Sequence, residues 1–204
     1  MKMREIAEGI YEVILHDKEK EVGEMRVHIV KGKPGKRSLM VDTGFGSQES
    51  LEDMEEALAA LDISYKDLDI FLTHKHHDHC GLASTFAKKG AKIFMNPEEE
   101  RHSYDCLYMQ MGEESQKEQK EVLKSVGISE EWTPKLWKRF MELNEWMAKQ
   151  REPWVYEIQK YPYVALTEGE TFSYGDYDFW VISLRGHTYG QRGPVSYTHL
   201  TLPT

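Results

Sequence analysis

A histidine-rich stretch, Thr73–Gly81, constrains the fold of this chain more than any other feature. Five of its nine residues are His or Asp, the side chains that bind divalent transition metals. The apolar run Asp69–Leu72 before it predicts a buried strand, and Leu82, Phe86 and Gly90 after it indicate a helix that ends at a glycine. The stretch is therefore expected on a strand-to-helix loop at the edge of a sheet, where rigid elements hold functional side chains.

The spacing within this stretch predicts a metal site. Side chains alternate in extended backbone, so His74 and His76 point the same way and can bind one ion. Asp78 and His79 come after the chain turns toward the helix, so they can face a second ion beside the first. Two ions roughly 4 Å apart can share a hydroxide in hydrolases. The competing interpretation is a polar loop whose histidines bind nothing.

Three segments together resemble one known family. The pattern His-X-His-X-Asp-His at 74–79 resembles the signature of the metallo-β-lactamase superfamily, a set of metal-dependent hydrolases. Val41–Gly44 resembles the strand-end turn of that family, and Arg185–Gly190 resembles the segment that supplies its third histidine. The resemblance extends from Ile6 to about Gly193, apart from a helical stretch in the middle. Within the superfamily, the chain most resembles the glyoxalase II-like branch.

The resemblance implies which residues would bind metal. His74, His76 and His187 would hold the first ion, while Asp78 and His79 would begin the site of a second. Asp78 is also the predicted catalytic residue, because its counterpart in the family is thought to accept or relay a proton. A histidine at position 76 favours zinc over the di-iron branch, which carries a glutamate there. Two zinc ions are therefore expected in the full-length parent, with iron or manganese as alternatives.

Asp42 has two interpretations. A carboxylate at the end of a buried strand, followed by Thr-Gly, can simply organise the turn. The family resemblance instead implies that it orients a ligand histidine through a hydrogen bond. Two other histidines, His16 and His28, lie among the first strands, and we expect neither to bind metal.

Composition limits the partners of the chain. A net charge of -9 over 204 residues argues against a phosphate-binding surface, so we expect a small-molecule substrate and no nucleic acid. Two cysteines, Cys80 and Cys106, are too few for a disulfide framework. The first residues lack an apolar signal region and no long apolar run follows, so no membrane segment is expected and the location is predicted to be cytoplasmic.

The periodicity of apolar residues predicts an α+β fold. Together with the resemblance it implies an αββα sandwich formed by residues 1–193, two packed sheets with helices outside. A two-stranded hairpin should span Leu166 to Leu184 and deliver His187 on the loop that follows. The remaining predicted elements are strands at Ile6–Leu15, Met25–Val30, Ser38–Val41 and Ala91–Met95 and an amphipathic helix at Gln48–Leu61.

Residues 97–162 are predicted to form a helical insertion within this domain. Asn96 and Pro97 begin a first helix, Glu113–Val126 indicates a second, and a third follows. The insertion is rich in aromatic residues and methionine, namely Tyr104, Tyr108, Met109, Met111, Trp132, Trp137, Trp146, Met147 and Trp154. These side chains form either the core of a small subdomain or a lid that selects an apolar substrate. His102 and Cys106 are one helical turn apart, but no further ligand stands near them.

The end of the sequence departs from the family pattern. After His187 there is no Asp or Glu, whereas the family would supply a bridging aspartate and a further histidine. The segment Val195–Thr204 resembles the translation of a transposase adapter used in preparing sequencing libraries. We therefore expect the authentic protein to end near Gly193, with 194–204 a non-native tail in which His199 is no ligand. The sandwich should then be incomplete at its C-terminus, with one apolar face uncovered.

Three functional hypotheses remain. The first is a hydrolase that uses a metal-bound hydroxide on a small-molecule ester, thioester or amide. The second is a nucleic-acid phosphodiesterase of the same superfamily, which would need a basic surface or an RNA-binding module that the sequence does not display. The third is a truncated metal-binding fragment without turnover. The sequence selects no particular substrate and no oligomeric state.

Overall fold

The computed structural model describes residues 2–15, 24–101, 117, 120–121, 123–129, 131–139, 142 and 161–196. Its chain forms two compact units, which are treated separately. The first combines Met1–Arg101 with Gln159–Thr204, and the second is His102–Ile158. All of the candidate metal ligands in the described ranges belong to the first unit.

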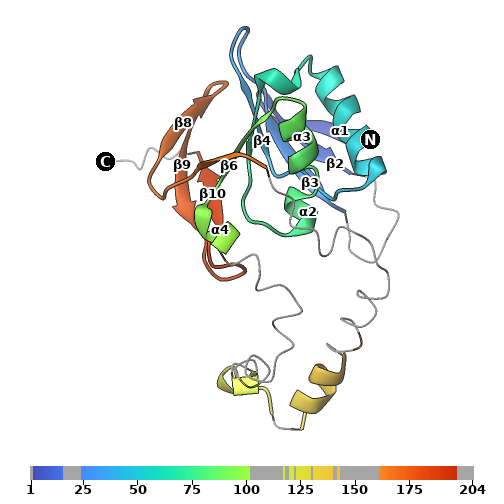
Figure 1. The fold of residues 1–204 in the computed structure, drawn as a ribbon, viewed down its shortest axis with the longest axis vertical. Helices are drawn as coiled ribbons and strands as arrows, with labels where there is room; N and C mark the ends of the chain where they lie inside the picture. Colours follow the sequence, from blue (N-terminus) through green and yellow to red (C-terminus); the bar gives the residue numbers. More distant parts are fainter. Residues whose placement is uncertain are drawn as a thin grey trace. The chain divides into compact units, whose positions relative to one another are not determined.

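The larger sheet of the first unit has seven strands in sequence order (Figure 1). They are β1 (Lys2–Ala7), β2 (Ile10–Ile14), β3 (Arg26–Val30), β4 (Ser38–Val41), β5 (Leu68–Phe71), β6 (Lys92–Met95) and β7 (Tyr163–Ala165). Strands β1 to β4 pair antiparallel, whereas β4 to β7 pair parallel. The carboxyl ends of β4, β5 and β6 therefore meet at one edge of the sheet.

A smaller antiparallel sheet and short helices complete the unit. The sheet has the strand order β10-β9-β8, with β8 at Thr171–Tyr174, β9 at Tyr177–Ser183 and β10 at Arg192–Val195. The helical elements are α1 (Gln48–Ala60), η1 (Tyr65–Asp67), α2 (His77–Cys80), α3 (Ala83–Lys88) and α4 (Pro97–Arg101). Ser47 caps α1, since its side chain accepts a hydrogen bond from the backbone N–H of Ser50.

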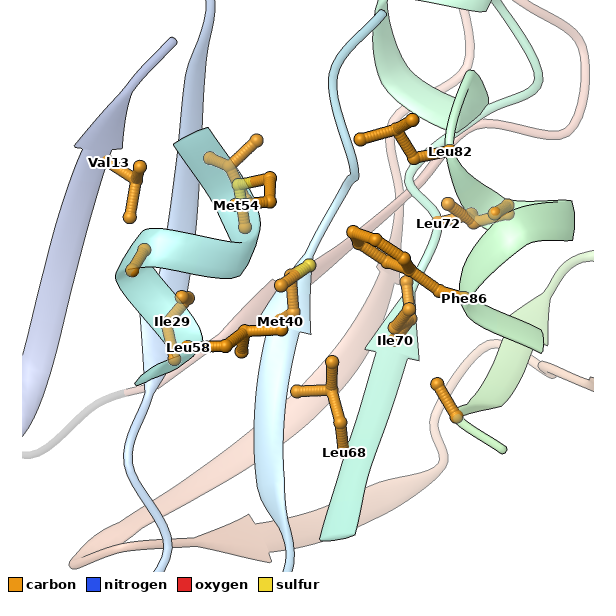
Figure 2. Packing of buried hydrophobic residues seen from close by; sticks show 14 of the residues in the cluster. Val13, Ile29, Met40, Met54, Leu58, Leu68, Ile70, Leu72, Leu82 and Phe86 are labelled. Atoms are coloured by element: carbon orange, nitrogen blue, oxygen red, sulfur yellow. The ribbon is translucent and has the colours of Figure 1, made fainter. Parts of the chain in front are cut away.

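Alternation along the central strands builds two apolar layers. On one face, Met40 and Ile70 pack with Met54 and Leu58 of α1 and with Phe86 of α3, as Figure 2 shows. The neighbouring strand residues point to the opposite face and pack against the smaller sheet, namely Val30, Leu39 and Phe71 with Phe179 and Val181. Helices, larger sheet and smaller sheet are thus three successive layers of a sandwich, and the predicted α+β class is confirmed.

The first predicted strand is wrong in one respect. Instead of one strand over Ile6–Leu15, the chain forms β1 and β2 with a turn at Glu8 and Gly9. The two strands pair directly, with Met3 opposite Val13. Apolar residues stand on both sides of the turn, so the pattern alone favours one long strand over a tight hairpin.

The predicted hairpin is also modified. Its second strand is β9, but its first strand, β8, begins only at Thr171. Leu166 lies before β8 and donates its backbone N–H to the carbonyl of Met95, so it belongs beside the larger sheet. On β9, Trp180 is 40% exposed whereas its neighbours Phe179 and Val181 are buried.

Within the second unit, helical backbone is described at 117, 120–121, 123–125, 133–139 and 142. Trp132 is exposed there and Trp137 is partly buried. All of the other aromatic residues and methionines named for the insertion lie outside the described residues, as do His16, His102, Cys106 and His199. In the described ranges, no helix is both long enough and apolar enough to cross a membrane.

Candidate metal centre

The centre lies at the edge where β4, β5 and β6 end. Asp42 directly follows β4, Thr73 and His74 follow β5, and Asn96 follows β6. Parallel strands place the segments after their carboxyl ends side by side, which is where α/β sheets usually bind ligands. The smaller sheet adds the fourth segment, because the backbone N–H of Arg192, at the start of β10, donates to the carbonyl of Thr73 over 3.0 Å.

Three histidines converge at this edge. The candidate ligand atoms of His74, His76 and His187 all lie within 4.8 Å of one another. Nδ1 of His76 is 2.9 Å from Nε2 of His187, although the two residues are 111 positions apart in the chain. The ring centroid of His74 is 4.8 Å from that of His76 and 4.8 Å from that of His187. His74 is buried, whereas His76 and His187 reach the surface.

A chain of hydrogen bonds fixes the tautomer of His74. The ionised carboxylate of Asp42 only accepts hydrogen bonds, so the hydroxyl of Thr73, 2.9 Å from Oδ2, donates to it. The same hydroxyl oxygen then accepts from Nδ1–H of His74, 2.9 Å away. Nε2 of His74 therefore carries a lone pair, and this buried atom has no hydrogen-bond partner. Burial, together with the charges of the neighbouring histidines, lowers the pKa of His74 to about 3.

Asp42 both shapes its turn and contacts Thr73 and the candidate ligand His79. Its φ of 63° lies in the left-handed region, which non-glycine residues seldom adopt and which costs of order 1–3 kcal/mol. Its Oδ1 accepts from the backbone N–H of Thr73 over 2.8 Å, and its Oδ2 is 2.7 Å from Nδ1 of His79. This geometry is therefore compatible with both interpretations of Asp42 from the sequence, namely that it organises the turn and that it orients a histidine.

Asp78 and His79 stand together beside the three histidines. Nε2 of His79 is 3.4 Å from Oδ2 of Asp78, and the His79 ring centroid is 4.0 Å from that of His74. Burial opposes the charged form of His79, but hydrogen bonds to Asp42 and Asp78 outweigh it and raise the pKa to about 10. Burial also opposes ionisation of Asp78, yet the contact with His79 leaves its pKa below the usual value. In the metal-free protein these residues form a charged pair.

The short helix α2 is held in place by its close approach to the segment after β4. The backbone N–H of Thr43 and its hydroxyl both donate to the carbonyl of His79, over 2.6 and 3.0 Å. A Cβ at Gly81 would lie 2.2 Å from the backbone nitrogen of Gly46, so only glycine fits there. This contact places Asp78 and His79 next to Asp42.

Sequence reasoning missed Glu99, whose carboxylate connects the two ligand-bearing loops. The sequence pattern presents it only as one of the acids in the first turn of α4, yet it is 5% exposed and its Oε2 accepts from the backbone N–H of Lys75 over 3.0 Å. Its position shortly after the end of β6 is a signal that could have identified it, because that strand end lies at the same edge as the histidines. His28, by contrast, lies on β3 and is not part of the cluster.

The donor set suits a divalent metal ion. Three neutral imidazoles with an open fourth position are a common zinc environment. The candidate ligand atoms of the three histidines lie within 4.8 Å of one another, so one ion could contact all three. The buried, unpartnered Nε2 of His74 is the orphaned acceptor that such an ion would satisfy.

Known proteins share both the sequence pattern and the fold. A sequence model of the metallo-beta-lactamase superfamily matches residues 27–149. Probable metallo-hydrolase YqjP of Bacillus subtilis (strain 168) is 34% identical over 67 residues, 32% of this chain and 20% of that protein. A beta-lactamase domain protein from Burkholderia ambifaria superposes with a TM-score of 0.63 at 17% identity, covering 96% of this chain and 54% of the other.

A second solved structure agrees. A metallo-beta-lactamase family protein from Thermus thermophilus gives a TM-score of 0.59 at 20% identity, covering 93% of this chain and 56% of the other. The chain thus spans little more than half the length of these two structures and a fifth of the length of the Bacillus protein. The family match includes the signature at 74–79, and the structural match includes the sandwich around it. The chain belongs to the metallo-beta-lactamase superfamily.

Proposed function

We propose that this chain carries the metal site of a hydrolase that acts on a small-molecule ester, thioester or amide. One observation carries the proposal. His74, His76 and His187 converge from distant segments, and Nε2 of His74 is buried there without a partner. The name of the Bacillus relative, a metallo-hydrolase, is in keeping with this assignment.

The three histidines would hold the first ion, and Asp78 with His79 would begin a second site. Zinc is the preferred ion, because its usual ligands are imidazole nitrogens and carboxylate oxygens. When bound, such an ion lowers the pKa of a water ligand to about 7 and polarises a carbonyl oxygen. The contribution of the chain itself is to fix the tautomer of His74 and to keep a proton acceptor, Asp78, beside the histidines.

The acidic character of the chain favours a small substrate over a nucleic acid. The net charge of -9 would repel a polyanion, and hydrolysis of a phosphodiester backbone calls for a basic surface. A cytoplasmic location belongs to the same proposal and stays a prediction.

The test begins with metal binding. The chain is stripped with a chelator, titrated with Zn²⁺ in competition with a chromophoric chelator, and then assayed on a thioester, an ester, an amide and a phosphodiester. We expect stoichiometric zinc and turnover of a carbonyl substrate, with both lost in His74→Ala. Turnover of the phosphodiester alone would favour the nuclease, and zinc without any turnover would favour a binding module. A chain that binds no zinc would refute the proposal.

A further inference from the structure

Glu99 contacts both loops that carry the three histidines. Its Oε2 accepts from the backbone N–H of Lys75, which lies between His74 and His76, over 3.0 Å. Its Oε1 accepts from the hydroxyl of Thr188, the residue after His187, over 2.6 Å. The same oxygen accepts from the backbone N–H of Gly190 over 2.8 Å. One side chain thus bridges two segments that are far apart in the sequence.

We infer that Glu99 is a positioning residue that sets the spacing between His76 and His187 and so determines the affinity of the first metal site. The inference rests on the proposed metal site. It assigns to Glu99 no contact with substrate or ion. Its role is to join the backbone on either side of the ligands.

The chemistry of the carboxylate suits this role. An ionised carboxylate is purely an acceptor with two oxygens, and here it meets three donors from two loops. Hydrogen bonds to a charged acceptor are roughly twice as strong as neutral ones. Glu99 is 5% exposed, so water does not compete freely for these donors. A single buried side chain with three hydrogen bonds can therefore hold both loops at one separation.

Gly190 allows the close approach that this arrangement needs. A Cβ at this position would lie 2.8 Å from Oε1 of Glu99 and 2.9 Å from its backbone nitrogen. The carbonyl of Gly190 accepts from the side-chain amide of Asn96 over 2.7 Å. Asn96 and Glu99 therefore hold both polar groups of Gly190, and the corner between β6 and α4 acts as one anchor for the loop of His187.

Neither helix α4 nor the backbone bond between Arg192 and Thr73 depends on the Glu99 carboxylate. The N-terminus of α4 is capped by Asn96, whose Oδ1 accepts from the backbone N–H of Glu98 over 3.2 Å. The two loops also stay adjacent through the bond from Arg192 N–H to the carbonyl of Thr73. Removal of the carboxylate should therefore loosen the ligand spacing while the strands remain paired.

The experiment compares Glu99→Ala, Glu99→Gln and a matched control, Glu12→Gln. Glu12 is also 5% exposed, but its carboxylate binds Arg4 and Arg26 away from the metal centre. Zn²⁺ affinity is measured by chelator competition, thermal unfolding is followed on the metal-free proteins, and hydrogen exchange of the Lys75 and Gly190 amides is followed by NMR. In Glu99→Gln the amide NH₂ must face the backbone N–H of Lys75 or of Gly190, so at least one of these N–H groups loses its acceptor while the size of the side chain is kept.

We expect Glu99→Ala to bind zinc roughly 10–100-fold more weakly, which is the usual effect of losing a contact that supports metal ligands. Glu99→Gln should lie between Glu99→Ala and the unchanged chain, and Glu12→Gln should bind normally. The Lys75 and Gly190 amides should exchange faster in Glu99→Ala. Unchanged affinity in both Glu99 variants would overturn the inference, even if exchange increased. If the unchanged chain binds no zinc, the proposed function fails, and unaltered amide exchange in Glu99→Ala would then refute the bridge separately.

Discussion

Oδ2 of Asp42 lies 2.7 Å from Nδ1 of His79, and the two residues are 37 positions apart in the chain. This contact joins the end of β4 to α2 and lies directly beside the three histidines. It gives a first prediction about the charge of His79.

Replacement of Asp42 by Asn should lower the pKa of His79 from about 10 toward its ordinary value of 6.5, because one of its two carboxylate partners is lost. A raised pKa stabilises the fold fully below about pH 6.5, and this contribution fades as pH rises through about 10. The free energy of unfolding of the unchanged, metal-free chain should therefore fall as the pH rises from about 6.5 to about 10. In Asp42→Asn this fall should be smaller. NMR titration of the His79 ring with urea unfolding at pH 6 and 9.5 measures both effects. An unchanged His79 titration in the variant would contradict the prediction.

His187→Ala should weaken zinc binding by more than the roughly 10–100-fold that outer contacts provide, since it removes a proposed ligand. His28→Ala is the matched control, because His28 lies on β3 outside the histidine cluster. Competition with a chromophoric chelator measures both affinities. Equal affinities for the two variants would exclude His187 from the site.

Tyr174→Phe should destabilise the protein by about 1–3 kcal/mol, since it leaves a buried acceptor without its donor. The Tyr174 hydroxyl donates to Oδ2 of Asp69 over 2.6 Å and so joins the smaller sheet to β5 of the larger one. Tyr177→Phe is the control and should change stability by less than about 1 kcal/mol, because its hydroxyl donates to the exposed carbonyl of Glu8. Urea unfolding of both variants tests the difference, which should vanish if the Asp69 contact contributes nothing.

Cys80 should be unreactive in the folded protein. Burial raises the pKa of its thiol to about 12, so almost no thiolate is present at pH 8. In a Cys106→Ser variant, a chromogenic disulfide reagent at pH 8 should label the protein only after denaturant is added. Rapid labelling without denaturant would show that α2 opens readily.

Sequence patterns predicted the elements around the site well. The strand Ser38–Val41 and the helix from Gln48 match the structure closely, because apolar period and capping residues act locally. The turn at Glu8 and Gly9 was missed, since a lone glycine within an apolar-rich run is a weak signal. Sheet order and register depend on contacts between distant strands, which periodicity does not encode.

The candidate site residues also differ in whether a local sequence signal identifies them. His74 and His76 follow from their local spacing, and His187 was identified by its resemblance to a family segment. Glu99 was not identified, because its partners Lys75 and Thr188 are distant in sequence and the bonds involve backbone or hydroxyl groups of ordinary type. A residue that acts by joining loops leaves little trace in composition or spacing.

The pairing of β6 with β7 has a consequence for how this scaffold can vary. Ile93 lies directly opposite Tyr163 in a parallel pair, so the connection leaves the carboxyl end of β6 at Met95 and crosses over to the amino end of β7 at Tyr163. The entropy of closing such a connection grows only slowly with its length. The length of this crossover can therefore vary above a minimum of about a dozen residues, provided that a grafted connection keeps Asn96 and Glu99, which hold the loop of His187.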